Sequence, residues 1–365
     1  MAFILTFLGK GGTGKTTAAI AAAKSYAAQG QRVLLLGQDE GLGILLGETG
    51  LASEPREISS SLWAAVLSTS YLLEQSWDEV KQLEAQYLRT PFFKSVFGQE
   101  LGVLPGMDSA LALYTLKALD ASGRYDVIVY DGQSSAATLR MFGLPEVLSW
   151  YLRRFREVFA ESDLGRAISP FLQPVAATVL NNADWMSGNF SQPFSQANDI
   201  LGQGQQAIAD PSRVAAYLVT TIDPVALKAA QTLWGSAQQI NLTVGGCLVS
   251  NATSLSDFHA QFSPLPLHVL PHRDEGDWRS LMEGLPNFKQ EAQQAPKPLT
   301  VDVTQRQVKL FLPGVAKNQV QLTQSGPELT IAAGDQRRNL LLPPELKGQS
   351  VKGAKFQDGY LFISL

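Results

Sequence analysis

A glycine-rich loop near the N-terminus constrains the fold more than any other feature of this sequence. Residues 9–16 read GKGGTGKT, which satisfies the pattern G-x-x-x-x-G-K-[ST]. The loop follows the apolar run 3–8 and precedes the alanine-rich stretch 16–30, so a strand leads into it and a helix leads out. The glycines let backbone N–H groups surround a phosphate, and the helix N-terminus adds its positive dipole end. The residues expected to bind a nucleotide are Gly11, Gly12, Thr13, Gly14, Lys15, Thr16 and Thr17.

Four side chains are expected to carry the chemistry, with ATP and Mg²⁺ as the cofactors. Lys15 would neutralise the β- and γ-phosphate oxygens, and the Thr16 hydroxyl would ligate Mg²⁺. Asp39 and Asp131 each end an apolar run, VLLLGQD and YDVIVYD, where α/β sheets place their chemistry. Either carboxylate could hold the Mg²⁺ shell or orient the attacking water, or simply cap a helix.

Strand and helix patterns alternate over about the first 285 residues. Further strands are expected at 33–37, 125–131, 215–221, 245–251 and 265–271, with a helix over about 59–90. Strands that are apolar throughout and alternate with helices indicate a parallel sheet covered on both faces, hence a doubly wound α/β domain over 1–288.

Two regions depart from this alternation. Within 140–213, a helix with apolar residues at 144, 148, 152, 155 and 159 precedes a stretch at 181–210 that is rich in Asn, Gln, Ser and Gly and is expected to form a loop or lid. A polar linker at 289–298 then leads to residues 299–365, where apolar and polar residues alternate between turns. This last region is predicted to be a small antiparallel β-sandwich.

Composition excludes several classes of protein. Lys and Arg number 29 and Asp and Glu 33, so the net charge is −4, and without a basic cluster nucleic acid is not expected as the main partner. Cys247 is the single cysteine, which excludes an internal disulfide and a Cys-rich zinc site. With three histidines, a structural metal site is not expected either. No signal peptide or membrane span is recognisable, so a cytoplasmic protein is the default expectation.

The loop also contains a second lysine, Lys10, five residues before Lys15. In this the sequence resembles the deviant P-loop ATPases, whose corresponding lysine reaches across a dimer to the partner's phosphates. The alternative for Lys10 is a solvated surface lysine. Residues 38–42, QDEGL, are similar to the first switch TDPAH of the family of the arsenite-pump ATPase and the ATPase that targets tail-anchored membrane proteins. Only the aspartate is shared, and the resemblance implies that Asp39 positions the hydrolytic water.

Further segments extend this resemblance over about residues 1–285. Residues 131–140 begin with Asp and end with Thr-Leu-Arg, as does the family's second switch, DTAPTGHTLR. The resemblance implies that Asn251 in LVSNA and Pro271 in VLPHRDEG contact adenine. The chain lacks the tandem loops and clustered cysteines of the pump and the CxxC zinc clasp of the targeting factor. Arsenite transport is therefore disfavoured, and a zinc-clasped dimer is excluded.

The C-terminal region is similar to the α-crystallin domain of small heat-shock proteins. Residues 311–315 read FLPGV, and 354–361 match the pattern A-x-x-x-x-G-x-L. An ATPase fused to such a domain resembles a branch found in photosynthetic lineages. The resemblance implies a bacterial cytoplasm, cyanobacterial included, or a plastid stroma.

The expected function is an ATP-dependent homodimer that binds a hydrophobic protein segment or an apolar ligand, with transient delivery to a membrane. The client-binding subdomain would comprise about 52–100 and 140–213, with 181–210 as a lid. Its candidate wall residues are Leu148, Leu152, Phe155 and Phe159, which could equally pack inside the protein. Two alternatives stay open: a partitioning or septum-positioning ATPase, and a nucleotide-stabilised scaffold without catalysis.

Overall fold

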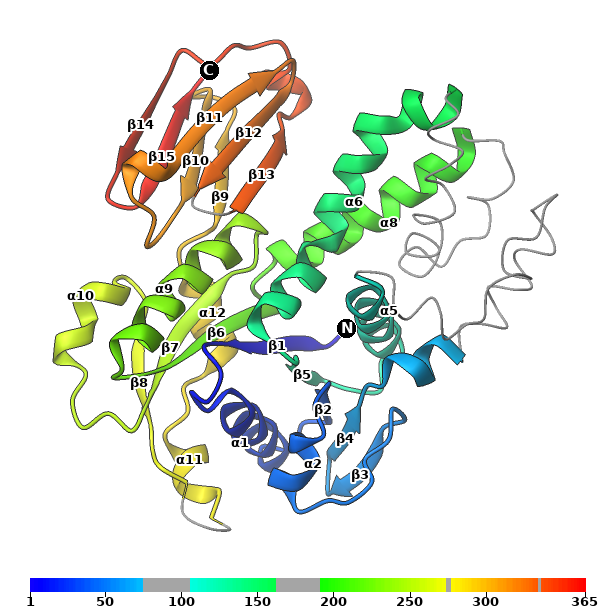
Figure 1. The fold of residues 1–365 in the computed structure, drawn as a ribbon, viewed down its shortest axis with the longest axis vertical. Coiled ribbons are helices and arrows are strands. Elements are labelled where there is room, and N and C mark those ends of the chain that lie inside the picture. Colours follow the sequence, from blue (N-terminus) through cyan, green and yellow to red (C-terminus); the bar gives the residue numbers. More distant parts are fainter. Residues whose placement is uncertain (75–105, 162–190, 274–276, 334–335) are drawn as a thin grey trace. The chain divides into compact units, whose positions relative to one another are not determined.

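The computed structural model describes residues 1–74, 106–161, 191–273, 277–333 and 336–365 (Figure 1). The chain divides into two compact units, of which the first holds residues 1–2 and 26–207 and the second holds 3–25 and 208–365. The second unit therefore contains both the glycine-rich loop and the whole C-terminal β region.

The strands of the first unit lie in the order β3-β4-β2-β5. Their bounds are β2 (Val33–Gly37), β3 (Arg56–Ser59), β4 (Leu62–Val66) and β5 (Val127–Asp131). β2 pairs in parallel with β4 and β5, whereas β3 runs antiparallel to β4. Every residue of β2 and β5 is buried, as expected for strands covered on both faces. The prediction of a helix over 59–90 is wrong for residues 62–66, which form β4. A short apolar run such as LWAAV is compatible with both a strand and a buried helix. Residues 75–90 lie outside the described residues.

Four of the helices described in the first unit are α2 (Gly41–Leu46), α5 (Met107–Ala121), α6 (Ser135–Glu161) and α8 (Ser191–Ala209). Figure 1 shows α6 and α8 running side by side. Leu152 is buried in a cluster with Ala110 of α5 and Leu201 of α8, and Leu148 packs against the same cluster. These two candidate groove residues therefore pack inside the helical layer. The side chains of Phe155 and Phe159 lie outside the described residues.

α8 overturns the expected loop at 191–209, and the rest of that segment, 181–190, lies outside the described residues. The many Asn, Gln and Ser residues suggested a loop, but the described part of α8 is anchored by buried Leu201 and Ile208. The Gln205 amide donates to the carbonyl of Pro145 in α6 at 3.0 Å. A Cβ on Gly204 would come within 3.3 Å of the Pro145 ring, so the glycine allows the two helices to approach closely. A helix can thus be built from polar residues when a few apolar positions face its neighbour.

The second unit begins with strand β1 and helix α1, on either side of the glycine-rich loop. Four strands lie in the order β1-β6-β7-β8, and each neighbouring pair is parallel. The strand bounds are β1 (Phe3–Leu8), β6 (Val214–Thr221), β7 (Val244–Ser250) and β8 (Leu267–Leu270). The helices are α1 (Lys15–Ala28), α9 (Pro224–Gln239), α10 (His259–Phe262), α11 (Arg279–Glu283) and α12 (Phe288–Gln294), and Ser256–Phe258 forms a 3-10 turn. The parallel register brings the carboxyl ends of the four strands to one edge.

Helix α12 occupies most of the segment at 289–298 expected to link the two domains, as far as Gln294. Phe288 is buried and packs edge-on against Tyr217 of β6, with ring centroids 4.7 Å apart. The Tyr217 hydroxyl contacts the Glu291 carboxylate at 3.0 Å. A Cβ on Gly246 would lie 2.8 Å from the Tyr217 ring and 3.2 Å from that carboxylate. A glycine in β7 therefore makes room for the tyrosine on which α12 packs.

The C-terminal region is an antiparallel β-sandwich, as the alternating pattern predicts. One sheet has the order β14-β15-β10-β9 and the other β11-β12-β13. Bounds are β9 (Leu299–Asp302), β10 (Gln307–Phe311), β11 (Val320–Ser325), β12 (Glu328–Ala333), β13 (Gln336–Leu341), β14 (Gly353–Gln357) and β15 (Tyr360–Ser364), with 3-10 turns at Lys317–Gln319 and Pro344–Leu346. Alternate residues of β10, β12 and β15, such as Leu310, Ile331 and Ile363, form its buried core.

The FLPGV segment of the β-sandwich packs against α9 of the same unit. The ring of Phe311 meets the buried Trp234 ring edge-on, with centroids 5.4 Å apart. A Cβ on Gly235 would lie 2.9 Å from the Pro313 carbonyl oxygen, and one on Gly314 3.1 Å from the Gln231 carbonyl oxygen. This segment is therefore part of the packing between α9 and the sandwich.

Candidate functional site

The glycine-rich loop joins the carboxyl end of β1 to the first turn of α1. Gly9 is packed so tightly that a Cβ there would lie 2.1 Å from the Val219 carbonyl oxygen of β6. Gly12 and Gly14 have φ angles of +81° and +99°, which favour glycine. A Cβ added to Gly11 or Gly12 would meet no atom within 4 Å. The loop is therefore held firmly at its start and is open over its middle, where a phosphate would lie.

Hydrogen bonds fold the loop around the carbonyl of Lys10. The Thr13 N–H donates to this oxygen at 3.3 Å, and the Thr13 hydroxyl donates to it at 2.9 Å. The Lys15 ammonium donates to the same carbonyl at 3.3 Å. Lys15 and Thr16 lie half-buried in the first turn of α1, while Lys10 is exposed. The loop thus brings the cation of Lys15 and the hydroxyl of Thr16 to the helix N-terminus, where anions are favoured.

The predicted base-binding residues lie at the carboxyl ends of β7 and β8. Ser250 of β7 and Leu270 of β8 are register partners, and Asn251 and Pro271 follow them directly. Asn251 is exposed with a φ of +59°, and its N–H donates to the Leu270 carbonyl at 3.2 Å. The structure therefore brings Asn251 and Pro271 together, within the same unit as the loop. Their contact with adenine stays a prediction.

The two predicted carboxylates belong to the first unit and differ in burial. Asp39 is exposed just after β2, and its carboxylate accepts a hydrogen bond from the Gly41 N–H at 2.7 Å. Asp131 is buried at the end of β5. The Gln38 N–H donates to the Asp131 carbonyl at 3.2 Å, so the structure brings the two strand ends together. The role of each carboxylate in Mg²⁺ binding or water activation stays a prediction.

Tyr130 holds the side chain of Gln38, the residue before Asp39. Its ring is buried, and its hydroxyl donates to the Gln38 side-chain oxygen at 2.9 Å. Burial raises the pKa of Tyr130 far above its usual range, and the nearby charge of Asp131 raises it further. The phenol therefore stays protonated and serves as a permanent donor to Gln38.

The donor set of the second unit fits a nucleoside triphosphate. Open glycines present backbone N–H groups, Lys15 supplies a positive charge, and Thr16 supplies a hydroxyl of the kind that ligates Mg²⁺ beside phosphates. Among the residues that the structure describes, no group of three or more His, Cys, Asp or Glu side chains is arranged to hold a metal by itself. Within the same described ranges, no helix is both long and apolar enough to cross a membrane.

Comparison with known proteins identifies the family. The family model described as "Anion-transporting ATPase", ArsA_ATPase, matches residues 1–260. The chain belongs to the ArsA ATPase family. A second model, described as "HSP20-like domain found in ArsA", matches residues 304–365. The chain is thus an ArsA-family ATP hydrolase with a C-terminal HSP20-like domain, and the recognised family, the fold class and the enzyme class predicted from sequence are confirmed.

Three relatives show how far the similarity of the ArsA-family chain extends. A "Putative arsenical pump-driving ATPase" of Chlorobaculum tepidum is 26% identical, over 99% of this chain and 95% of its own length. A "Putative arsenical pump-driving ATPase 1" of Aquifex aeolicus is 20% identical over 99% of both chains. An "ATPase ASNA1 homolog" of Babesia bovis is 30% identical over 48% of this chain and 47% of its own length. The similarity to the bacterial proteins therefore includes the HSP20-like region.

Sequence patterns do not reveal three residues that shape either the phosphate-binding loop or the carboxylate segments of this ArsA-family chain. Gly9 is packed against β6, Tyr130 holds Gln38, and the Ser250 hydroxyl donates to the Thr13 carbonyl at 2.7 Å. Gly9 is part of the motif, but its packing partner lies 210 positions away in the sequence. Ser250 stands directly before Asn251, yet nothing in the letters LVSNA indicates a bond to a loop near the N-terminus. Such contacts become visible only when the strand order is known.

Proposed function

We propose that this protein is a homodimeric ATPase that binds hydrophobic protein segments, and that ATP binding and hydrolysis close and open its binding groove. Two exposed apolar side chains on α6 of the first unit carry this proposal. Val147 and Tyr151, one turn apart on α6, are 48% and 41% exposed. Leu148 and Leu152 of the same helix pack inward. α6 therefore has a buried apolar side and a second, exposed apolar site suited to a client segment.

The nucleotide chemistry follows from the loop and the two carboxylates. Lys15 and the loop N–H groups would bind the phosphates, and Thr16 with Asp131 would hold Mg²⁺, which neutralises the charge that develops during phosphoryl transfer. Asp39 would orient the hydrolytic water. Among the residues that the structure describes, its exposed carboxylate is bonded to the nearby Gly41 N–H, a local contact that would let it reposition when nucleotide binds.

The exposed position of Lys10 supports a site completed by a second subunit. Its carbonyl anchors the loop, while its side chain is exposed at the loop surface. In a symmetric dimer that meets at this surface, each Lys10 would approach the phosphates of the other subunit. Two cationic groups, Lys15 in cis and Lys10 in trans, would then act on one triphosphate.

Mixing two inactive variants tests the dimer. Lys10→Ala and Asp39→Asn should each lose most of the steady-state ATP hydrolysis. If Lys10 acts in trans, a mixed dimer has one intact site, so an equal mixture should recover about a quarter of wild-type activity. If Lys10 acts within its own subunit, neither site of the mixed dimer is intact and mixing recovers nothing. Hydrolysis by none of the proteins, wild type included, would instead favour the non-catalytic scaffold.

Capture of an apolar peptide tests the client site. The probe is a fluorescent Leu/Ala-rich helical peptide, titrated into the full-length protein with ATP or ADP. The double variant Val147→Asp with Tyr151→Asp should weaken peptide binding at least tenfold, because charges would replace the apolar contact. Val303→Asp is the matched control, since Val303 is also 41% exposed but lies in the β-sandwich region. Equal binding by the double variant and wild type would disprove the assignment to α6. ATP-dependent binding to anionic vesicles instead of peptide would favour the partitioning-type alternative.

A further inference from the structure

Ser250 connects the end of β7 to the phosphate-binding loop. It is the last residue of β7 and is 8% exposed. Its hydroxyl donates to the Thr13 carbonyl oxygen at 2.7 Å, across 237 positions of sequence. A Cβ added to Gly14 would lie 3.2 Å from the same hydroxyl oxygen. The loop therefore passes directly over the Ser250 hydroxyl, and a side chain on Gly14 would crowd it.

Ser250 holds Thr13, the residue at which the loop turns back toward Lys10. Thr13 is buried, and both its N–H and its hydroxyl donate to the Lys10 carbonyl. Its own carbonyl points the other way, to Ser250. Since the Lys15 ammonium contacts the Lys10 carbonyl as well, one chain of hydrogen bonds runs from Ser250 through Thr13 and Lys10 to Lys15.

Ser250 also borders the predicted base-binding side. Asn251 follows it in a left-handed conformation, bonded to the end of β8. The same strand end thus carries Asn251 on one side and supports the phosphate loop on the other. Movement of the end of β7 would be transmitted to Thr13 through the Ser250 bond.

We infer that Ser250 is a positioning residue for ATP hydrolysis: its hydroxyl fixes Thr13 and Gly14, and through them the phosphate-binding arrangement of Lys15. In this role Ser250 acts through the loop backbone, by its bond to the Thr13 carbonyl. Removing the hydroxyl takes a donor from a buried carbonyl and loosens the loop where it must be preorganised. Loss of the hydroxyl should weaken binding of the phosphate groups and leave binding of the adenine base unchanged.

Calorimetric titration of the 365-residue chain with three probes separates binding of the phosphates from binding of the base. The probes are MgADP, inorganic pyrophosphate with Mg²⁺, and adenosine. Ser250→Ala should weaken MgADP and pyrophosphate by the same factor, about tenfold for one lost hydrogen bond to a buried group, with adenosine unchanged. In hydrolysis, KM for ATP should rise by a similar factor while kcat stays within about threefold, because the bond supports substrate and transition state alike. Ser250→Thr, which keeps the hydroxyl, should restore pyrophosphate binding.

A matched control is Ser254→Ala, since Ser254 lies exposed in the loop after β7 and its hydroxyl contacts only the neighbouring Ser256 among the contacts described. This variant should bind all three probes as the wild type does. Unchanged pyrophosphate binding by Ser250→Ala would overturn the inference. So would a loss of adenosine and pyrophosphate together with a lower melting temperature, which indicates a merely structural role. The inference rests on nucleotide binding and not on dimerisation or client capture, so it can fail while those proposals hold.

Discussion

The phosphate-binding loop of the second unit and the carboxylate segments of the first unit are anchored in different ways. Thr13 is bonded to Ser250, and Gly9 packs against Val219, both contacts between residues more than 200 positions apart. Asp39, by contrast, is bonded to Gly41 two residues on, and its side chain is exposed. The loop is therefore formed in advance by the surrounding sheet, whereas the contact described for the Asp39 side chain is the local one to Gly41, although Gln38 before it is bonded to Tyr130 and Asp131. A segment that must respond to the γ-phosphate is expected to have few distant contacts.

Gly9→Ala should have the largest effect on nucleotide binding, because it disrupts the packing of the loop against β6. The added Cβ would lie 2.1 Å from the Val219 carbonyl oxygen and 2.7 Å from the Thr13 hydroxyl, so either the loop or β6 must shift. We expect the affinity for MgADP to fall at least a hundredfold and the melting temperature to drop. Calorimetric titration and thermal unfolding measure the two effects.

The matched control is Gly11→Ala, where an added Cβ meets no atom within 4 Å. The nucleotide-free Gly11→Ala protein should melt as the wild type does, whatever its affinity for ADP. Should Gly9→Ala bind ADP normally, the loop is not held by its packing against β6 and the comparison fails.

Asp39→Asn should have a large effect on turnover alone. Because Asp39 is exposed, the amide replaces the carboxylate without a packing cost, and the melting temperature should not change. Loss of a group that orients the attacking water should reduce kcat about a hundredfold, with MgADP affinity within twofold of wild type. Single-turnover hydrolysis and ADP titration on the same preparations make the measurement. A fall in ADP affinity as large as that in kcat would show that Asp39 serves binding instead.

Tyr130→Phe tests whether the bond from Tyr130 to Gln38 orders the Asp39 segment before nucleotide binds. The variant removes the donor to Gln38 but keeps the buried ring, which packs edge-on against Phe142 at 6.2 Å. We expect a loss of about 1 kcal/mol in the free energy of unfolding and a several-fold lower kcat, because Gln38 precedes Asp39. Urea unfolding and steady-state hydrolysis give both numbers. A wild-type kcat would indicate that the Asp39 segment acts independently of the buried tyrosine.

The same contrast explains what the sequence can predict. Glycine spacing, apolar runs and alternation are local patterns, and they indicate the loop, the parallel strands and the β-sandwich correctly. The failures are short or polar segments whose structure depends on neighbours. β4 is a strand because it pairs with β2, and the part of α8 at 200–208 is helical because Leu201 and Ile208 face buried surroundings. Ser250 and Tyr130 were missed for a related reason, since their roles depend on which strand ends adjoin.

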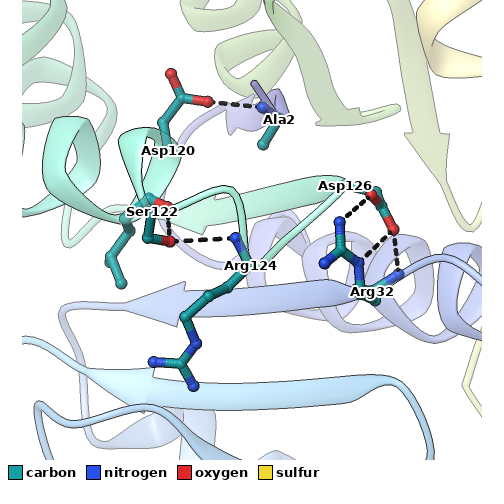
Figure 2. Close-up of polar contacts among 7 residues, drawn as sticks. Ala2, Arg32, Asp120, Ser122, Arg124 and Asp126 are labelled. Atoms are coloured by element: carbon teal, nitrogen blue, oxygen red, sulfur yellow. Dashed lines mark hydrogen bonds and ion pairs between the residues drawn. The ribbon is translucent and has the colours of Figure 1, made fainter.

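The smallest effect is expected at the opposite ends of β2 and β5, where Arg32 and Asp126 precede the two strands. Figure 2 shows the Asp126 carboxylate accepting from the Arg32 guanidinium, at 2.7 and 3.1 Å, and from the Arg32 N–H at 2.9 Å. The Arg32 hydrogen bonds lower the pKa of Asp126 to about 2. Both side chains are nearly half exposed, at 49% and 45%, so solvent screening keeps the contribution small.

The pH dependence of this pair has a definite sign. Because the pKa of Asp126 is lower in the folded protein than in the unfolded chain, the pair stabilises the fold above the ordinary carboxyl pKa of about 4 and loses that contribution as the pH falls toward 2. Arg32→Ala should therefore lower the urea midpoint slightly at pH 7, and its difference from wild type should shrink as the pH falls from 5 to 3.

Arg124→Ala is the control for this pair, since Figure 2 shows the Arg124 side chain pointing away from Asp126. Its difference from wild type should not depend on pH in that range. MgADP affinity should be unchanged in both variants, because the pair ties β2 to β5 at their amino ends, whereas Asp39 and Asp131 follow or end the same strands at the carboxyl ends. A change in kcat for Arg32→Ala would mean that this anchor also orders the Asp39 segment, and the first unit would then resemble the second in being organised before nucleotide binds.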